Sequence, residues 1–391
     1  MYIVRQNAAE QCRDGCRSHQ NHRGENMAVE KRLNVRKHGV ICHGPADMPG
    51  SYYGWPTVAR MEDGSLVAGA SGFRNAHICP YGKCVIFRST DEGAAWSKPQ
   101  IICNSLIDDR DVGLTPLPGN ELLLSWFTSD TTWHIDAADH TPDMQEWTEE
   151  DILKNLGSFT KLCRADGSWT KRRIAPVSAP HGPIVLRNGD LLYLGTRCSS
   201  PADNRTLQET RERTDHPQTA LVSRDRGESW EERGGIPLME GLHQCEPHVI
   251  ELEDGTLIGH IRARMLDRTR PDFSALQLYQ SVSRDGGVTW STPEYLCEGG
   301  PAHLLRHSSG VLISSYSYRL PGFGQRVMLS YDQGQTWDTD LVIRDDGNTR
   351  DLGYPSTVEL KDGSLLTVYY QALPGESTCA VLFSEWELPE K

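Results

Sequence analysis

The stretch that decides the fold is SYDQGQTW, residues 330–337, because close copies of it recur along the chain. The copies are STDEGAAW at residues 89–96, SRDRGESW at 223–230 and SRDGGVTW at 283–290, with a shorter ADGSW at 165–169. In such a segment the Asp accepts hydrogen bonds from the turn backbone, the Gly supplies a positive φ and the Trp covers the hairpin. The pattern therefore predicts a tight turn that is repeated between pairs of strands.

A second repeat consists of an apolar strand, a turn and another apolar strand. Its turns often contain Asp-Gly or Asn-Gly, which are strong hairpin signals between apolar runs. The copies are residues 56–66, 114–122, 183–191, 247–257, 302–312 and 355–365. Four-stranded propeller blades recur at about this spacing. Six copies predict an all-β chain in which residues 31–391 form a single six-bladed β-propeller.

The flanks and interruptions of the repeats lead to three further expectations. TPDMQEWTEEDILKNL, residues 141–156, has Pro and acidic residues where a helix would begin, so we expect a helical insertion near residues 140–158. Residues 1–30 are polar and are expected to form a disordered leader. Residues 33–42 are expected to supply a strand that completes the last blade and closes the ring.

Composition excludes several classes of partner. The chain has 391 residues, with 40 Lys and Arg against 53 Asp and Glu, so its formal net charge is −13. No basic run of five or more residues is present, and nucleic acid is not expected because phosphate binding needs clustered cations. The 11 cysteines are irregularly spaced and indicate no disulfide framework. With neither a signal peptide nor an apolar run of membrane length, we expect a cytoplasmic protein without membrane contact, metal or cofactor.

The Ser-x-Asp-x-Gly-x-x-Trp segments resemble the Asp boxes of the sialidase (neuraminidase) superfamily, whose members are six-bladed propellers with BNR repeats. The resemblance implies a tyrosine nucleophile paired with a glutamate, three arginines that hold the substrate carboxylate, and an aspartic acid as acid/base. Tyrosine nucleophiles are an exception among glycosidases. A carboxylate nucleophile would be repelled by the anionic substrate, whereas a phenol is neutral until a base takes its proton.

Four residues match this set. Tyr354 begins YPSTVELKDGSL, which looks like the segment that bears the nucleophile, and Glu246 begins EPHVIELEDGTL, which looks like the segment that bears its partner. Arg262 lies on the following strand, and Arg326 precedes the last Asp box, where two of the family's arginines lie. Arginine suits this role because its planar guanidinium pairs with a carboxylate in bidentate fashion.

Two elements of the family pattern are absent. GWP at residues 54–56 stands where the family has Arg-Ile-Pro, so the first arginine is missing. The loop SGFRNAH at residues 71–77 contains no aspartate. Arg74 is therefore a candidate for the third positive charge. His77 is a candidate acid/base because the ordinary pKa of histidine suits proton transfer near neutrality, with Asp111 as the alternative.

The residues around the start of each predicted inner strand are expected to converge at one mouth of the channel. They are Trp55, Asp111, His181, Glu246, His303 and Tyr354. Convergent ionisable groups in one concavity are typical of a functional site. His181, His303 and Trp55 are therefore candidate substrate contacts, Trp55 by stacking on a sugar face.

Three functions are compatible with these residues. The first is an exo-acting glycoside hydrolase that cleaves a terminal acidic sugar, sialic acid or a related one, from a carbohydrate substrate. The second is a uronate polysaccharide lyase on the same scaffold, in which a His or Tyr abstracts a proton beside a carboxylate neutralised by an arginine. The third is a propeller that binds glycans without catalysis. The sequence favours the first and leaves the sugar, the linkage and the oligomeric state open.

Overall fold

The computed structural model describes residues 31–45, 48–135, 140–198, 206–211, 217–267, 269 and 275–390. The expected leader, residues 1–30, lies outside this part of the chain. No helix within the described residues is long and apolar enough to cross a membrane.

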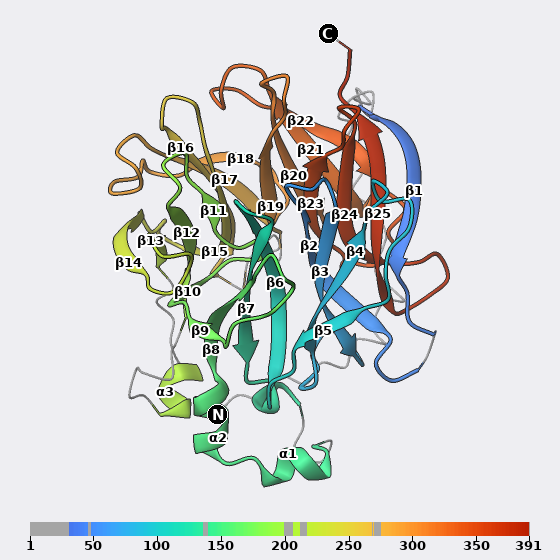
Figure 1. Ribbon diagram of the computed structural model, residues 1–391, viewed down its shortest axis with the longest axis vertical. Coiled ribbons are helices and arrows are strands. Elements are labelled where there is room, and N and C mark those ends of the chain that lie inside the picture. The colour runs from blue at the N-terminus through green and yellow to red at the C-terminus, as the bar shows by residue number, and fades with distance from the viewer. Residues whose placement is uncertain are drawn as a thin grey trace. The chain divides into compact units, whose positions relative to one another are not determined.

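The strands form six antiparallel sheets, which we number as blades 1–6 in chain order (Figure 1). Blade 1 contains β2 (Tyr52–Arg60), β3 (Leu66–Arg74), β4 (Lys83–Ser89) and β5 (Gln100–Cys103). Blade 2 contains β6 (Asp108–Leu117), β7 (Glu121–Ser129), β8 (Gly157–Cys163) and β9 (Arg173–Ile174). Blade 3 contains β10 (Val177–Ser178), β11 (Ile184–Val185), β12 (Leu191–Arg197), β13 (Gln218–Ser223) and β14 (Glu231–Ile236).

Blades 4 to 6 follow the same order from the inner to the outer strand. Blade 4 contains β15 (Leu242–Glu251), β16 (Leu257–Met265), β17 (Gln277–Ser283) and β18 (Glu294–Glu298). Blade 5 contains β19 (Ala302–Arg306), β20 (Leu312–Tyr318), β21 (Gly324–Ser330) and β22 (Asp338–Arg344). Blade 6 contains β23 (Gly353–Glu359), β24 (Leu365–Ala372), β25 (Cys379–Glu387) and β1 (Asn34–Cys42). The predicted six-bladed propeller is thereby confirmed.

Blade 6 closes the ring, because its outermost strand comes from the start of the described chain. β1 pairs antiparallel with β25, in the register Gly39 to Phe383. Figure 1 shows the blue β1 beside the red β25. The first and last parts of the propeller are therefore joined by a backbone ladder.

Apolar side chains fill every contact between neighbouring blades. Each contact has a buried cluster to which both blades contribute, as in Phe87 and Leu366 (blades 1 and 6), Ile86 and Leu124 (1 and 2), Leu123 and Leu191 (2 and 3), Leu194 and Val249 (3 and 4), Ile258 and Leu312 (4 and 5), and Leu329 and Trp386 (5 and 6). Burial of these side chains supplies the main favourable free energy of the ring.

The Ser-x-Asp-x-Gly-x-x-Trp segments form tight turns between the two outermost strands of their blades in chain order. In the copy at residues 330–337, Asp332 accepts hydrogen bonds from the Ser330 hydroxyl (2.8 Å), the Thr336 backbone N–H (2.9 Å) and the Thr336 hydroxyl (2.6 Å). Gly334 has φ +80°, and a Cβ there would lie 2.3 Å from Cδ1 of Ile258 on blade 4. Glycine is therefore needed both for the turn and for close packing against the next blade.

Two helical segments interrupt the strands. Between β7 and β8 lie η1 (Thr132–His134), α1 (Pro142–Glu146) and α2 (Glu149–Asn155), and α3 (Leu207–Arg211) lies between β12 and β13. α2 begins with a capping box in which Thr148 and Asp151 exchange hydrogen bonds. Leu207 of α3 packs with Ile152 of α2, so the two insertions support each other.

Candidate active site

Four inner strands carry the same backbone irregularity, and each presents a large or ionisable side chain there. Trp55 (φ 53°), Asp111 (φ 53°), Glu246 (φ 52°) and Tyr354 (φ 51°) all have left-handed backbone conformations. Each sits at a register shift between the first and second strands of its blade. A positive φ is costly for residues other than glycine, and such strain is characteristic of functional sites. We call these four residues the bulge cluster.

The other two blades have glycine at the corresponding place. Gly182 has φ 83° and Gly300 has φ 119°, and each precedes a proline, as Trp55, Glu246 and Tyr354 do. A residue with positive φ at this place therefore recurs in every blade. In blades 1, 2, 4 and 6 this residue has a large or ionisable side chain, and the bulge orients it. These four side chains therefore supply the chemistry of the cluster.

Tyr354 and Glu246 form a direct pair, although 108 positions separate them in the chain. The Tyr354 hydroxyl donates to Oε1 of Glu246 at 2.7 Å, and Nη1 of Arg262 lies 2.9 Å from Oε2 of Glu246. Arg262 also donates from Nε and Nη2 to Sγ of Cys245, at 3.3 and 3.1 Å. One carboxylate oxygen thus receives the phenol, while the other is neutralised by Arg262.

Burial raises the pKa of Tyr354 well above its ordinary value, and the charges of Glu246 and Asp111 raise it further, against the opposing effect of Arg262. The phenol is consequently neutral at physiological pH. It becomes a nucleophile only if a neighbour takes its proton, and Glu246 is placed to do so.

Asp111 is nearly fully buried, with 5% of its surface exposed. Burial raises the pKa of its carboxyl to about 7, even though Arg110 lowers it. Among the described residues, Oδ1 of Asp111 has no hydrogen-bond partner. Asp111 can therefore exist as a neutral carboxylic acid near neutral pH and donate a proton.

Two arginines border the cluster that the sequence did not single out. Arg110 lies 4.1 Å from the centre of the Trp55 ring, and Arg319 lies 5.7 Å from that of Tyr354. Within the described part of the chain, Nε of Arg110 and Nη2 of Arg319 are buried without a hydrogen-bond partner. Buried donors of this kind normally have partners, so these atoms are available to an anionic group.

His77 lies at the edge of the cluster, with 44% of its side chain exposed. Its ring packs edge-on against Trp55 at 5.0 Å between ring centres. Its Nδ1 lies 2.8 Å from Oδ1 of Asp351, a further residue that the sequence did not single out. Asp351 lies three positions before Tyr354 in the sequence. This proximity to the candidate nucleophile is the local signal that could have identified Asp351 as a site residue.

The structure places the other two candidate arginines differently from Arg262. Arg74 is fully buried in a bidentate ion pair with Asp108 and also donates to the backbone carbonyl of His77. Its guanidinium is thus engaged behind the Trp55 ring, 4.7 Å from the ring centre. Arg326 lies on β21 with its guanidinium 4.5 Å from the centre of the Tyr318 ring.

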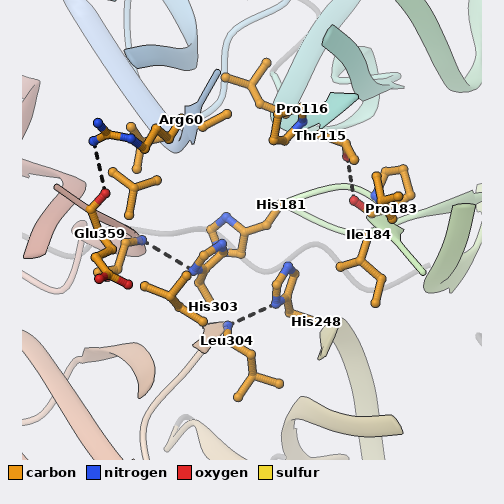
Figure 2. A pocket seen from close by; sticks show the side chains of 17 residues that line it. Arg60, Thr115, Pro116, His181, Pro183, Ile184, His248, His303, Leu304 and Glu359 are labelled. Atoms are coloured by element: carbon orange, nitrogen blue, oxygen red, sulfur yellow. Dashed lines mark hydrogen bonds between the residues drawn. The ribbon is translucent and has the colours of Figure 1, made fainter. Parts of the chain in front are cut away.

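His181 and His303 lie further along the channel with a third histidine, His248 (Figure 2). Backbone N–H groups of the next blade donate to two of them, from Leu304 to Nδ1 of His248 (3.0 Å) and from Thr357 to Nδ1 of His303 (3.3 Å). Nδ1 of His181 lies 2.9 Å from the Thr57 hydroxyl. These histidines therefore tie inner strands of different blades together, below the bulge cluster.

A cavity of about 390 Å³ adjoins the three histidines. Its walls are the parts of the inner strands that follow the bulges, including Val58, Leu114, Ile184, Leu304 and Val358. Figure 2 shows the histidines at its centre. The described residues contain no group of three or more His, Cys, Asp or Glu side chains arranged to hold a metal ion.

The sequence from residue 85 to 368 matches a known family, described as the BNR repeat-like domain. The chain belongs to this family. The predicted relationship to the sialidase-like BNR propellers is thereby confirmed. No curated protein sequence matches the chain.

Solved structures of similar fold include glycoside hydrolases. A Dyadobacter fermentans protein of unknown function has a TM-score of 0.72 at 20% identity, covering 91% of this chain and 99% of its own. The Hadza microbial sialidase Hz136 has a TM-score of 0.64 at 16% identity, covering 90% and 68%. A Penicillium chrysogenum α-L-arabinanase, complexed with arabinobiose, has a TM-score of 0.59 at 16% identity, covering 91% and 98%. At these identities the likeness establishes the fold.

Proposed function

We propose that the protein is an exo-acting glycoside hydrolase that cleaves a terminal acidic sugar, such as a sialic acid, through a tyrosyl–sugar intermediate. The observation that carries the proposal is the 2.7 Å hydrogen bond from the buried Tyr354 hydroxyl to Glu246. Two further features support it: the left-handed backbone at both residues and the arginines that surround them. Glycoside hydrolases among the proteins of similar fold support the reaction class.

In the first step, the Tyr354 oxygen attacks the anomeric carbon while Glu246 takes the phenol proton. A neutral phenol approaches an anionic sugar without the repulsion that a carboxylate would meet. Arg262 holds Glu246 in position through the contact of 2.9 Å. Hydrolysis of the intermediate by water on the same face then releases the sugar with retained configuration.

The leaving oxygen needs a proton as its bond to the sugar breaks. We assign this role to His77, because its imidazole is partly exposed at the edge of the cluster. Asp111 is the alternative acid, since its carboxyl has a pKa of about 7 as a result of burial. A general acid with a pKa near the working pH gives the most effective proton transfer.

The substrate carboxylate is held by arginines in this proposal. Arg110 and Arg319 supply buried N–H groups that lack a partner among the described residues, and Arg262 adds a third positive charge. Arg110 replaces Arg74 in this role, because Arg74 is fully buried against Asp108. Trp55, 4.1 Å from the Arg110 guanidinium, holds that side chain in position.

The first experiment measures release of the fluorophore from a fluorogenic α-sialoside by the parent protein and by Tyr354→Phe. The expected result is turnover by the parent and a loss of about 1000-fold or more in the variant, because the nucleophile is removed. Tyr279→Phe is the matched control, since it removes a hydroxyl from β17, where Tyr279 bonds Gln277. Proton NMR of the first released anomer then tests retention.

Absence of release by the parent would contradict sialoside hydrolysis. Uronate polysaccharides would then be the substrates to examine, with ultraviolet absorbance of an unsaturated product as the sign of a lyase. Binding of an acidic glycan without turnover of either substrate class would indicate a non-catalytic propeller.

A further inference from the structure

Asp351 joins the last blade to the loop of the first blade that carries His77. Besides Nδ1 of His77 at 2.8 Å, the carboxylate accepts hydrogen bonds from the Tyr52 hydroxyl at 2.9 and 3.0 Å and from the Tyr370 hydroxyl at 3.0 Å. Tyr52 lies on β2 and Tyr370 on β24, and both are buried. Three side chains from three separate segments therefore converge on one carboxylate.

The protonation states of this group follow from its donors. Burial raises the pKa values of Tyr52 and Tyr370 well above the ordinary value for tyrosine, so both phenols are neutral and donate their protons. Burial alone would raise the pKa of Asp351, but the hydrogen bonds from His77, Tyr52 and Tyr370 hold it below its usual value. Asp351 is thus an ionised acceptor at neutral pH, and Nδ1 of His77 must be the donor towards it.

We propose that Asp351 is the positioning residue of a histidine–aspartate pair, which holds Nδ1–H of His77 so that Nε2 gives and takes the proton in glycoside cleavage. This inference rests on the proposed function. It explains how a loop without an aspartate, residues 71–77, still acts with a carboxylate: the carboxylate comes from the chain segment that precedes β23. A histidine whose Nδ1–H is fixed by a carboxylate has a defined tautomer and ring orientation.

The proton balance is as follows. In the first half-reaction, Nε2–H of the His77 imidazolium protonates the glycosidic oxygen as its bond to the sugar breaks and the bond to the Tyr354 oxygen forms. In the second, neutral Nε2 takes a proton from the attacking water, the bond to Tyr354 breaks, and Glu246 returns its proton to the phenol. Asp351 keeps its charge throughout and exchanges no proton.

Asp351 is the acidic group that contacts the His77 ring, whereas Asp108 pairs with the two guanidinium groups at the His77 carbonyl. The His77 carbonyl accepts from Arg74 (3.0 Å) and from Arg110 (3.4 Å), while Trp55 and the neutral Tyr52 face the ring. Removal of the Asp351 charge would leave Nδ1 of His77 without its carboxylate acceptor. The pair should therefore matter most for the protonated, acid form of His77.

The test compares two leaving groups in the parent and in Asp351→Asn. With sialyllactose, whose sugar alkoxide needs protonation, kcat/KM, which reports the first half-reaction, is expected to fall about 100-fold. With a 4-nitrophenyl sialoside, whose phenolate leaves without a proton, kcat/KM should fall less than about fivefold. Asp345→Asn is the matched control, because it removes a carboxylate from the same connecting segment, where it pairs with Arg32. Equal losses on the two substrates would overturn the proposal, since a purely structural role affects both alike.

A second measurement needs no activity. In ¹⁵N NMR of the imidazole groups, Nδ1 of His77 is expected to be protonated in the parent, with this preference lost in Asp351→Ala. If the parent cleaves neither sialoside, the proposed hydrolysis is contradicted. The histidine–aspartate pair is tested separately, by the protonation of Nδ1 in this spectrum. An unprotonated Nδ1 of His77 in the parent would overturn it.

Discussion

The outer turns and the inner bulges both force the chain into left-handed backbone, but they treat polar groups in opposite ways. In the outer turn at residues 330–337, Asp332 is surrounded by donors, and hydrogen bonds, above all from the Thr336 hydroxyl, lower its pKa to about 2. At the inner bulge, Asp111 is buried with an unpartnered oxygen among the described residues, and its pKa rises to about 7. The carboxylate of Asp332 thus stabilises the turn through its hydrogen bonds. The carboxyl of Asp111 has an oxygen without such a bond and can exchange a proton near neutral pH.

The largest effect is expected at the bulges. Glu246→Gln keeps the shape of the side chain but removes the base for Tyr354, so kcat should fall about 100- to 10,000-fold. The amide can still accept the phenol hydrogen bond but no longer neutralises Arg262, so the melting temperature should fall and kcat is expressed per folded molecule. Glu294→Gln, an exposed position on β18, is the control. If Glu246→Gln retained more than a tenth of the parent kcat, Glu246 would not be the base for Tyr354, and the catalytic role of the bulge cluster would be contradicted.

A substitution in an outer turn should have the reverse signature. Gly334→Ala adds a methyl group where φ is +80° and Ile258 is only 2.3 Å away, so unfolding in urea should show a loss of about 2–3 kcal/mol. Activity per folded molecule should not change. Gly310→Ala has a similar φ of +88° but open space, and should cost only about 1 kcal/mol. Equal losses in both variants would show that packing against the next blade contributes nothing.

The pH dependence of stability separates the two kinds of aspartate. The folded-state pKa of Asp111 is raised to about 7, so the stability it contributes is complete below its unfolded pKa near 4 and is lost as pH rises through 7. Asp111→Asn should therefore gain about 2 kcal/mol relative to the parent between pH 5 and pH 8. Urea unfolding at both pH values measures this difference, and a difference independent of pH would contradict burial of an ionisable Asp111.

The last effect concerns one of the histidine ties in the channel and is confined to acid pH. Burial lowers the pKa of His303 to about 3, so its contribution to stability is complete above about 6.5 and declines as pH falls towards 3. His303→Asn should reduce the acid-side slope of the unfolding free energy by up to about 1.4 kcal/mol per pH unit between pH 4 and 6. The control is His140→Asn in the insertion between η1 and α1, where Nε2 of His140 lies 3.0 Å from the Thr132 carbonyl oxygen. An unchanged slope in His303→Asn would mean that His303 is already solvated.

Sequence reasoning was most effective where the structure is local. The turns at residues 89–96 and 330–337 need only eight consecutive residues, and the hairpins that follow each bulge are equally short, so their pattern is visible in the chain. The bulge residues Trp55, Glu246 and Tyr354 could be identified because each begins a repeat and precedes a proline. The resemblance to sialidases selected Tyr354 and Glu246 together, and the structure brings them within hydrogen-bond distance.

The local sequence determined the turns, the blades and the side chains that stand at the bulges, because these depend on φ preferences and on strand periodicity over a few residues. Packing between neighbouring blades decided which arginine is buried, Arg74 with Asp108, and which ones border the cluster, Arg110 and Arg319. It also paired His77 with Asp351 across 274 positions. Such pairings depend on where the first and last blades meet, and no short-range pattern encodes a contact that forms only when the ring is complete.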